Sequence, residues 1–260
     1  MRKKRLIFAL LHQDGYFVLS RNFRLQKVGD VNWLIDNYNL AEVVKSIDEL
    51  AIISVSRNRI IHETYLRDCE IISKVCFTPK IFGGGIASVE DAKRLFDSGA
   101  DKIIVNSLCF SNSALVSDLV RLFGSQAVVG CLDVLKDKVS GEYKVFVKNG
   151  SEVSTLNLRE CVAKLDELGV GEIMIQSISQ DGTGFGLDLA VVDAVVAEKN
   201  TGSRPIVLAG GAGYHAHLAE ALAHPNVNAV LTANILNFIG DSLSTTRRDL
   251  IDSGIGLAKF

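Results

Sequence analysis

Two stretches of the sequence share one build but end on side chains of different chemistry. LIFALLHQDG (residues 6–15) and AVVGCLDVLKD (residues 127–137) each lead from an apolar run into a polar loop. The first apolar run ends on Leu11, and the second ends on Asp133. An aspartate at the end of a strand can act as a general acid or base, whereas leucine cannot transfer a proton. Asp133 is therefore the candidate catalytic residue, and capping of the following helix or loop is the alternative.

Glycines and small polar residues form two clusters that could bind phosphate. Residues 83–85 and 210–211 are glycines, and Asn106-Ser107 and Ala233-Asn234 each follow the next apolar run. Glycine lets backbone N–H groups approach an anion, and helix N-termini direct positive charge towards it. The two clusters predict two phosphate sites, unless the glycines only make tight turns. A further loop, SQDGTGFG (residues 179–186), contains Asp181 and Gly182 and could bind a hydroxyl or phosphate, or be a flexible connection.

The elements that would position these residues alternate between short β-branched runs and longer amphipathic runs. Strands are predicted at residues 5–11, 49–55, 80–82, 102–106, 127–132, 172–177, 205–208 and 229–232. Helices are predicted at residues 88–98, 156–168, 187–199 and 215–223, the first with Ser88 as its N-cap. About eight strand–helix units, with strands apolar on both faces, predict an α/β fold in the form of a closed (β/α)8 barrel, or TIM barrel. An open doubly wound sheet is the alternative.

The chain also resembles itself. Residues 82–107 (FGGGIASVEDAKRLFDSGADKIIVNS) are echoed by residues 208–234 after a shift of about 126 residues, close to half the length. This repeat predicts that the barrel is built from two half-barrels. The same shift makes Leu11 and Asp133 twin positions in the two halves.

A hairpin interrupts the pattern after the fifth predicted strand. The segment EYKVFVKNGSEVS alternates in polarity around Asn149-Gly150, which is a strong two-residue turn signal. We expect a β-hairpin flap near residues 140–155, lying over the carboxyl end of that strand.

Four charged residues stand at the starts of predicted strands one, two, four and six. They are Arg5, Glu49, Lys102 and Glu172. Strand starts collect at the lower face of a barrel, so these charges of alternating sign should meet around its axis. Charged residues that lie so near one another are retained only when they are paired. The residues alone favour a plug that seals the floor; the alternative is a gate for something small and neutral.

Composition narrows the class of protein. The chain has 260 residues, of which 48% are hydrophobic, and it has no Gly/Ser-rich linker, so we expect one domain over residues 1–260. A formal charge of −2 does not indicate a protein that binds nucleic acid. No apolar run approaches the roughly 20 residues of a membrane helix. Small solutes or protein partners are the expected ligands.

The cysteines and histidines predict neither a metal site nor a cofactor. The five cysteines are odd in number, never form a C-x-x-C pair and sit in apolar segments, which is typical of reduced thiols in a cytoplasmic protein. The five histidines show no ligand spacing, so solvated or capping roles are expected. By strand alternation, His12 should point away from the side that Leu11 faces.

Together these stretches resemble the cyclase subunit of imidazole glycerol phosphate synthase, the ammonia-using partner of a glutaminase in histidine biosynthesis. The matching motifs, in the family's order, are DG at residues 14–15, IDEL at 47–50, GGGI, GADKIIVNS, FGSQAVV at 123–129, GEIMIQSISQDGT and AGGAG. The resemblance implies that the lower face docks the glutaminase and that the four charges gate ammonia, which reverses the preference for a plug. It maps the two phosphate sites onto Gly85, Asn106 and Ser107, and onto Asp181, Gly182, Gly211, Ala233 and Asn234.

The chain departs from this family at the catalytic positions. The family uses two aspartates as acid and base, and only Asp133 is present because Leu11 occupies the other place. Leu19 and Ser20 replace the usual Lys-Gly, and Ser54 replaces an aspartate. General acid–base groups contribute roughly 10²- to 10⁴-fold each, so cyclase activity should be heavily impaired.

An intact gate with damaged chemistry resembles a paralogous branch of the family found in surface-polysaccharide gene clusters. There a glutaminase and a cyclase-like barrel deliver ammonia to a separate amidotransferase that makes an acetamidino sugar. The favoured hypothesis is therefore an ammonia-conducting subunit of a glutamine amidotransferase complex. Two alternatives remain: a working cyclase that uses Asp133 alone or with Asp14, and a phosphate-binding barrel without a glutaminase partner.

Overall fold

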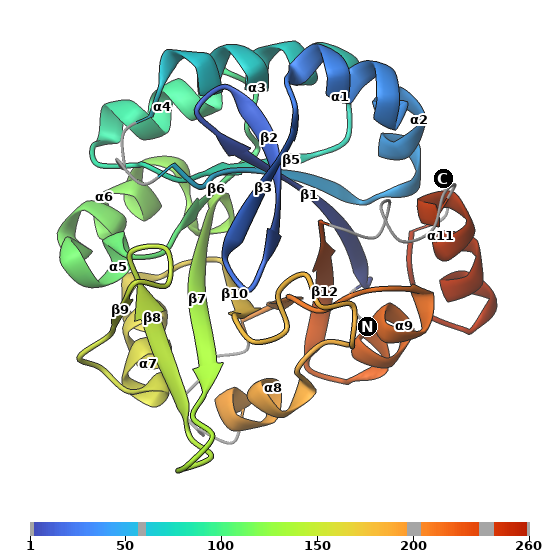
Figure 1. Ribbon diagram of the computed structural model, residues 1–260. Coiled ribbons are helices and arrows are strands. Elements are labelled where there is room, and N and C mark those ends of the chain that lie inside the picture. The colour runs from blue at the N-terminus through green and yellow to red at the C-terminus, as the bar shows by residue number, and fades with distance from the viewer. Residues whose placement is uncertain (1–2, 57–60, 197–203, 234–241, 259–260) are drawn as a thin grey trace.

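Parallel strands close into a barrel at the centre of the molecule. The computed structural model describes residues 3–56, 61–196, 204–233 and 242–258 (Figure 1). Within these residues, eight parallel strands form the barrel: β1 (Arg5–Gln13), β4 (Glu49–Ser54), β5 (Lys80–Gly83), β6 (Lys102–Val105), β7 (Val128–Lys136), β10 (Glu172–Ser177), β11 (Ile206–Ala209) and β12 (Val227–Thr232). β12 pairs with β1, and this pairing closes the sheet. The fold is therefore the predicted TIM barrel and not an open doubly wound sheet.

Helices surround the barrel in the order expected for repeated strand–helix units (Figure 1). They are α1 (Val31–Tyr38), α2 (Leu40–Val43), α3 (Glu63–Val75), α4 (Val89–Asp97), α5 (Leu108–Ser111), α6 (Ser113–Phe123), α7 (Leu158–Leu168), α8 (Leu189–Val196), α9 (His215–Ala223) and α11 (Ser242–Asp252), with 3-10 turns η1 (Val44–Ser46) and η2 (Ser125–Ala127). The Ser88 side chain accepts a hydrogen bond from the Asp91 N–H, which confirms the predicted N-cap of α4. No helix in the described ranges is long and apolar enough to cross a membrane.

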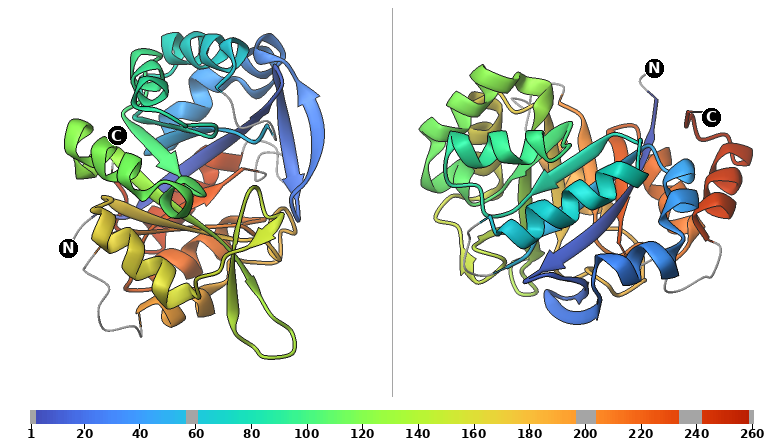
Figure 2. Two further views of the ribbon diagram at one scale, coloured as in Figure 1. Left: turned by 90° about the vertical axis from the view of Figure 1, so that its left-hand side faces the viewer. Right: turned by 90° about the horizontal axis from the view of Figure 1, so that it is seen from above.

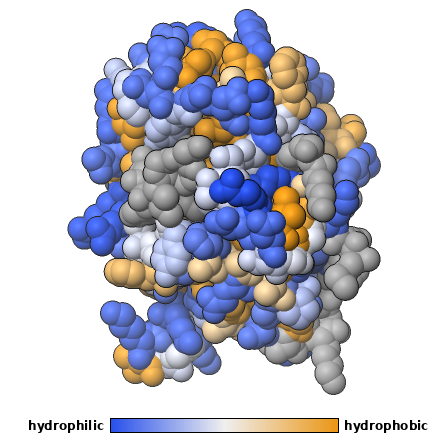
Figure 3. All heavy atoms as spheres, turned by 90° about the vertical axis from the view of Figure 1, so that its right-hand side faces the viewer, coloured by the Kyte–Doolittle hydropathy of each residue, from blue (hydrophilic) through white to orange (hydrophobic). Residues whose placement is uncertain are grey.

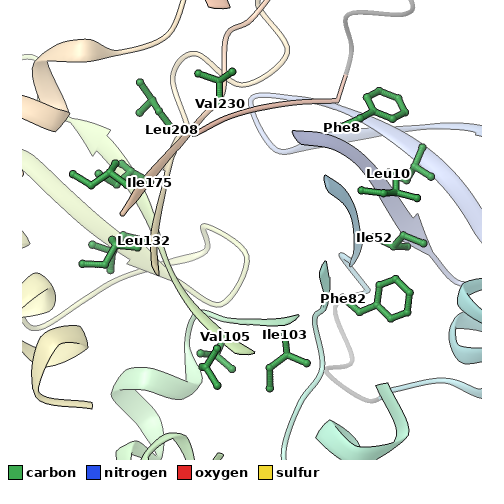
Figure 4. Close-up of a cluster of buried hydrophobic side chains, with 14 of the residues drawn as sticks. Phe8, Leu10, Ile52, Phe82, Ile103, Val105, Leu132, Ile175, Leu208 and Val230 are labelled. Carbon is green, nitrogen blue, oxygen red and sulfur yellow. The ribbon is translucent and has the colours of Figure 1, made fainter. Parts of the chain in front are cut away.

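Each barrel strand contributes to two separate apolar layers, because successive side chains point to opposite faces. Residues such as Phe8, Ile52 and Leu132 point outwards from the barrel, as Figure 4 shows, and pack against the helices. Their neighbours Ile7, Ala51 and others point inwards and form a second cluster. The flank seen in Figure 3 is mainly hydrophilic with scattered apolar groups, as expected for the outside of such a shell.

The two glycine clusters take equivalent positions in the two halves of the barrel. Gly84 follows β5 and Gly211 follows β11, four barrel strands apart, and both have positive φ. A Cβ on Gly84 would lie 2.0 Å from the Ser54 carbonyl oxygen, and one on Gly211 would lie 2.0 Å from the Gly186 carbonyl oxygen. Only glycine fits where these backbones meet.

Two antiparallel hairpins leave the barrel on the side opposite the N-terminus (Figure 2). The predicted flap is present as β8 (Tyr143–Val147) and β9 (Glu152–Val153). The β2–β3 hairpin, made of β2 (Tyr16–Arg21) and β3 (Arg24–Gly29), was not predicted, because β3 is largely polar and the Asn22-Phe23 turn lacks an Asn-Gly signal.

The predicted ends of the first and fifth barrel strands were too early. β1 continues to Gln13 because it pairs with β2, and β7 continues to Lys136 because it pairs with β8. Leu11 and Asp133 therefore lie inside longer strands and not at their last residues.

The sequence predicted solvated or capping roles for the histidines, and for His12 this prediction is wrong. His12 points out of the barrel, as alternation predicted, but it is only 1% exposed and contacts the Asp68 carboxylate at 3.1 Å. The rings of Phe17 and Tyr65 pack against it. A polar side chain in this position is retained because α3 supplies its partner. The five cysteines are buried free thiols.

The two-layer packing predicts that truncating two phenylalanines on either side of the start of β5 will lower the free energy of unfolding by very different amounts. Phe82 is 0% exposed and Phe77 is 90% exposed. Phe82→Ala should lower the free energy of unfolding by about 3–5 kcal/mol through the cavity that it leaves. Phe77→Ala, the matched control, should change it by no more than about 0.5 kcal/mol. Urea unfolding measures both, and similar losses in the two variants would contradict this packing.

Candidate functional site

A cavity of about 510 Å³ lies at the carboxyl ends of the barrel strands. Leu11 and Asp133 both line it. Of the predicted phosphate-site residues, it is also lined by Gly85, Asn106, Ser107, Asp181, Gly182, Gly211 and Ala233. The remaining one, Asn234, lies outside the described residues. The fold therefore gathers residues from distant parts of the chain around one cavity.

Asp133 stands in this cavity as a buried carboxyl group. Burial raises its pKa from 3.8 to about 7; a hydrogen bond with the Asn106 side chain opposes the rise, and the nearby Asp181 carboxylate adds to it. The Cys131 thiol lies 3.9 Å away. A carboxyl group with a pKa near 7 can both give and accept a proton, which suits general acid–base chemistry.

Leu11 faces the same cavity from β1 and offers no second acid. Ser54, at the end of β4, also lines the cavity without supplying a carboxylate. Asp14, the residue considered as a helper, is exposed at the turn beyond β1 and accepts a hydrogen bond from the Ser56 hydroxyl at 2.9 Å. Asp14 does not line the cavity, so the structure gives Asp133 no aid from that side chain.

Both hairpins reach over the cavity, and the sequence analysis assigned no site role to their residues. Ser20, Phe23 and Leu25 of the β2–β3 hairpin line it, as does Asn149 of the β8–β9 hairpin. The only sequence signal for the first hairpin was that Leu19 and Ser20 depart from the usual Lys-Gly pair. That signal was interpreted as lost chemistry, not as a structural contact.

At the opposite end of the barrel, the four predicted charges meet in one cluster, the charged ring (Arg5, Glu49, Lys102 and Glu172). Arg5 Nη1 lies 2.5 Å from Glu49 Oε1, and Arg5 Nη2 lies 2.7 Å from Glu172 Oε2. Lys102 Nζ lies 2.9 Å from Glu49 Oε1 and 2.8 Å from Glu172 Oε1. Each base therefore contacts both acids, and the four side chains close a cycle.

The electrostatics of the charged ring favour its ionised form. Burial raises the pKa of Glu172, but the hydrogen bonds and charges of Arg5 and Lys102 outweigh it and leave the pKa below its ordinary value. The same partners hold the pKa of Arg5 above its ordinary value despite burial. Glu49 Oε2 is buried and has no hydrogen-bond partner among the described residues.

An apolar column joins the charged ring to the cavity. Each ring residue is paired across the sheet with a member of the inner cluster: Arg5 with Ala229, Glu49 with Ile7, Lys102 with Ile81 and Glu172 with Val129. Other members of that cluster, including Ala9, Ile104 and Leu231, line the cavity. The barrel axis thus runs from paired charges through apolar side chains to the cavity. No group of three potential metal ligands occurs in the part of the chain that the structure describes.

Comparison with known proteins decides the family. The family model described as "Histidine biosynthesis protein" matches residues 7–241, most of the chain. The chain belongs to this family. The match includes both glycine clusters and three members of the charged ring.

Relatives of this histidine biosynthesis family member are HisF subunits. It is 41% identical over 247 residues to the "Putative imidazole glycerol phosphate synthase subunit hisF2" of Parasynechococcus marenigrum, covering 95% of this chain and 90% of that one. It is 33% identical over 253 residues to the imidazole glycerol phosphate synthase subunit HisF of Leuconostoc mesenteroides, covering 97% of each. A HisF subunit of Pyrobaculum aerophilum is 34% identical over 243 residues, covering 93% and 92%. The chain is a HisF-like barrel.

The burial of Asp133 predicts a pH-dependent stability that a single substitution removes. The folded chain binds the Asp133 proton more tightly than the unfolded chain, because the pKa is about 7 in one and close to 3.8 in the other. This contribution to stability is therefore complete below about pH 4 and is lost as the pH rises to about 7. The asparagine in Asp133→Asn cannot ionise. Across that pH window, the free energy of unfolding of this variant should rise by about 1–4 kcal/mol relative to that of the unmodified chain.

Urea unfolding at several pH values across that window measures the effect. Asp36→Asn is the control, because it removes the same charge from an exposed position. A difference between Asp133→Asn and the unmodified chain that stays constant with pH would contradict the buried, proton-binding site.

Proposed function

We propose that this HisF-like barrel receives ammonia from a glutaminase subunit and conducts it to the upper cavity for the amidation of a surface-polysaccharide sugar. The observation that carries the proposal is the closed charged ring beneath an apolar column that ends in the cavity. Residues 1–260 would act as one domain in the cytoplasm, where buried thiols stay reduced. The glutaminase would dock at the lower face, and a separate sugar amidotransferase would use the ammonia.

The chemistry of the column suits neutral ammonia and excludes ammonium. A cation entering apolar surroundings loses its hydration, at a cost far above that for a small neutral molecule. The charged ring has two bases and two acids, so it presents no net charge to repel or trap the passing molecule. The unpartnered Glu49 Oε2 can accept an N–H of ammonia inside the ring.

Lys102 is the ring member best suited to move. Arg5 binds Glu172 through two nitrogens, which fixes the orientation of its planar group. Lys102 contacts each acid through a single nitrogen on a flexible stem. We infer that the Lys102 side chain swings aside when ammonia enters and that Arg5 holds the acids in place.

A second candidate function is the authentic cyclase of imidazole glycerol phosphate synthase, which forms imidazole glycerol phosphate and AICAR in histidine biosynthesis. One observation favours it: Asp133, with a pKa of about 7, faces a cavity lined by both predicted phosphate clusters, so a phosphorylated small molecule fits there. Against it stands Leu11, which leaves the cavity without the family's second acid. A phosphate-binding barrel without a glutaminase partner is the third candidate, but it gives no reason for the charged ring.

Direct assay separates conduit from cyclase. Purified protein supplied with ammonium salt and the phosphoribosyl substrate should show little turnover, because one acid–base group is missing. Rates of about 1 to 10³ per second would refute the conduit. Leu11→Asp should raise the rate by about 10²- to 10⁴-fold if the cavity still binds that substrate. Leu11→Asn, which has nearly the same shape without an acid, is the control.

The charged ring is tested by coupling. In a complex with a glutaminase subunit, Lys102→Ala should uncouple glutamine hydrolysis from ammonia transfer while far-UV circular dichroism stays unchanged. Lys80→Ala is the matched control, because Lys80 begins the neighbouring strand β5 but lies outside the ring. Failure of the two proteins to associate in a pull-down, or equal coupling in both variants, would sink the proposal.

A further inference from the structure

Polar residues at the rim of the cavity make hydrogen bonds to the hairpins that reach over it. We propose that Ser20 and Asp181 form a latch that fastens the β2–β3 hairpin across the mouth of the barrel, so that Asp181 acts as a positioning residue and not as a ligand contact. The role that we give to this closed roof, retention of a small neutral nucleophile, rests on the proposed function. The latch itself rests on contacts within the chain.

The carboxylate of Asp181 is bound by protein donors on both oxygens. Its Oδ2 accepts the Ser20 hydroxyl at 2.5 Å and the Phe23 N–H at 3.0 Å. Its Oδ1 accepts the Gln176 side-chain amide at 3.3 Å. Hydrogen bonds to an ionised carboxylate are about twice as strong as those between neutral groups. The Asp181 carboxylate is therefore already held by three donors of the protein itself.

The tip of the hairpin is also fastened through its backbone. The Asn22 N–H donates to the Asp181 carbonyl oxygen at 2.9 Å, and the Asn22 side chain donates to the carbonyl oxygens of Ile178 at 3.2 Å and Ser179 at 3.0 Å. Asn22 and Phe23 both have positive φ, as in a tight two-residue hairpin turn. A left-handed Phe is unfavourable alone, so these contacts hold the turn in shape.

The fit between hairpin and loop depends on a glycine. A Cβ on Gly182 would lie 2.1 Å from the Ser20 carbonyl oxygen, so the two backbones meet without space for a side chain. Ser20 is only 6% exposed at this contact.

The β8–β9 hairpin covers the cavity from the other side. The Lys148 N–H donates to the Ser107 hydroxyl at 2.8 Å, and the Asn149 side chain donates to the Val55 carbonyl oxygen at 3.4 Å. The Phe23 ring lies so close to Gly150 that a Cβ there would stand 2.6 Å from it. The tips of the two hairpins therefore meet above the cavity that Phe23 and Asn149 help to line.

This arrangement suits a chamber better than a site that exchanges a large substrate at every turnover. All the latch bonds join protein groups, so closure needs no ligand. Hairpins fastened in this way cover part of the cavity mouth and so slow the escape of a small neutral molecule into solvent from above, while the charged ring controls entry from below. Opening would require the latch bonds to break together.

Amide hydrogen exchange on the isolated chain tests the latch. In Ser20→Ala, the amides of Asn22 and Phe23 should exchange about 10- to 100-fold faster, because both are latch donors and one anchoring bond is lost. Ser20→Thr keeps the hydroxyl and should restore slow exchange, which a purely steric role would not do. Ser151→Ala is the control, since its hydroxyl makes only a local bond within the other hairpin. Unchanged exchange in Ser20→Ala, or equal acceleration in the Thr variant, overturns the latch.

Trypsin provides a second measurement if Ser20 variants fold poorly. Arg21 and Arg24 flank the hairpin tip, so Asp181→Asn should speed cleavage at these residues relative to cleavage at exposed Lys45. Equal cleavage rates in the Asn variant and the unmodified chain would count against the latch. Neither experiment uses the glutaminase. Faster opening without any loss of ammonia coupling in the full complex would retain the latch and reject its role in the conduit.

Discussion

The whole arrangement depends on four charges that are buried together at the floor of a barrel. Charges in such a place are unfavourable unless each has a partner, and here each base contacts two acids. The ring members come from β1, β4, β6 and β10, so the cycle can close only when the whole barrel is assembled. Removing one member would leave an uncompensated charge against an apolar column. A chain that needed only a filled core could have used leucines at these positions.

The two halves of the barrel differ at one inward position of its upper end. The two halves still share glycine pairs and a hairpin after the first strand of each half, but one inward position holds Asp133 and its twin holds Leu11. Proton transfer needs matched groups around the reacting atoms, whereas guiding a small neutral molecule needs only shape and the absence of water. The second task tolerates the loss of an acid, and this tolerance underlies the preference for a conduit.

Sequence periodicity was enough to predict the barrel, because its strands are apolar on both faces and five of the eight begin with a charged residue. The charged ring followed from that pattern alone, although its closure around one axis is a property of the folded chain. The β2–β3 hairpin could not be predicted in the same way: Arg21, Arg24 and Lys27 interrupt any apolar alternation, and its stability comes from bonds to Asp181, about 160 residues away. His12 was misjudged for a similar reason, since its partner Asp68 lies on another element. Long-range polar pairing leaves no local signal.

The anchoring of the hairpins crosses between the two halves of the chain. β2–β3 grows out of the first half but rests on the loop after β10 in the second, and β8–β9 grows out of the second half but rests on loops after β4 and β6 in the first. Each half thus carries a hairpin that is anchored on loops of the other half. An ancestor of half the length, with one such hairpin, would have gained this mutual anchoring only on fusion or dimerisation. After that, a change of loop length in one half would weaken the anchoring of the hairpin that belongs to the other.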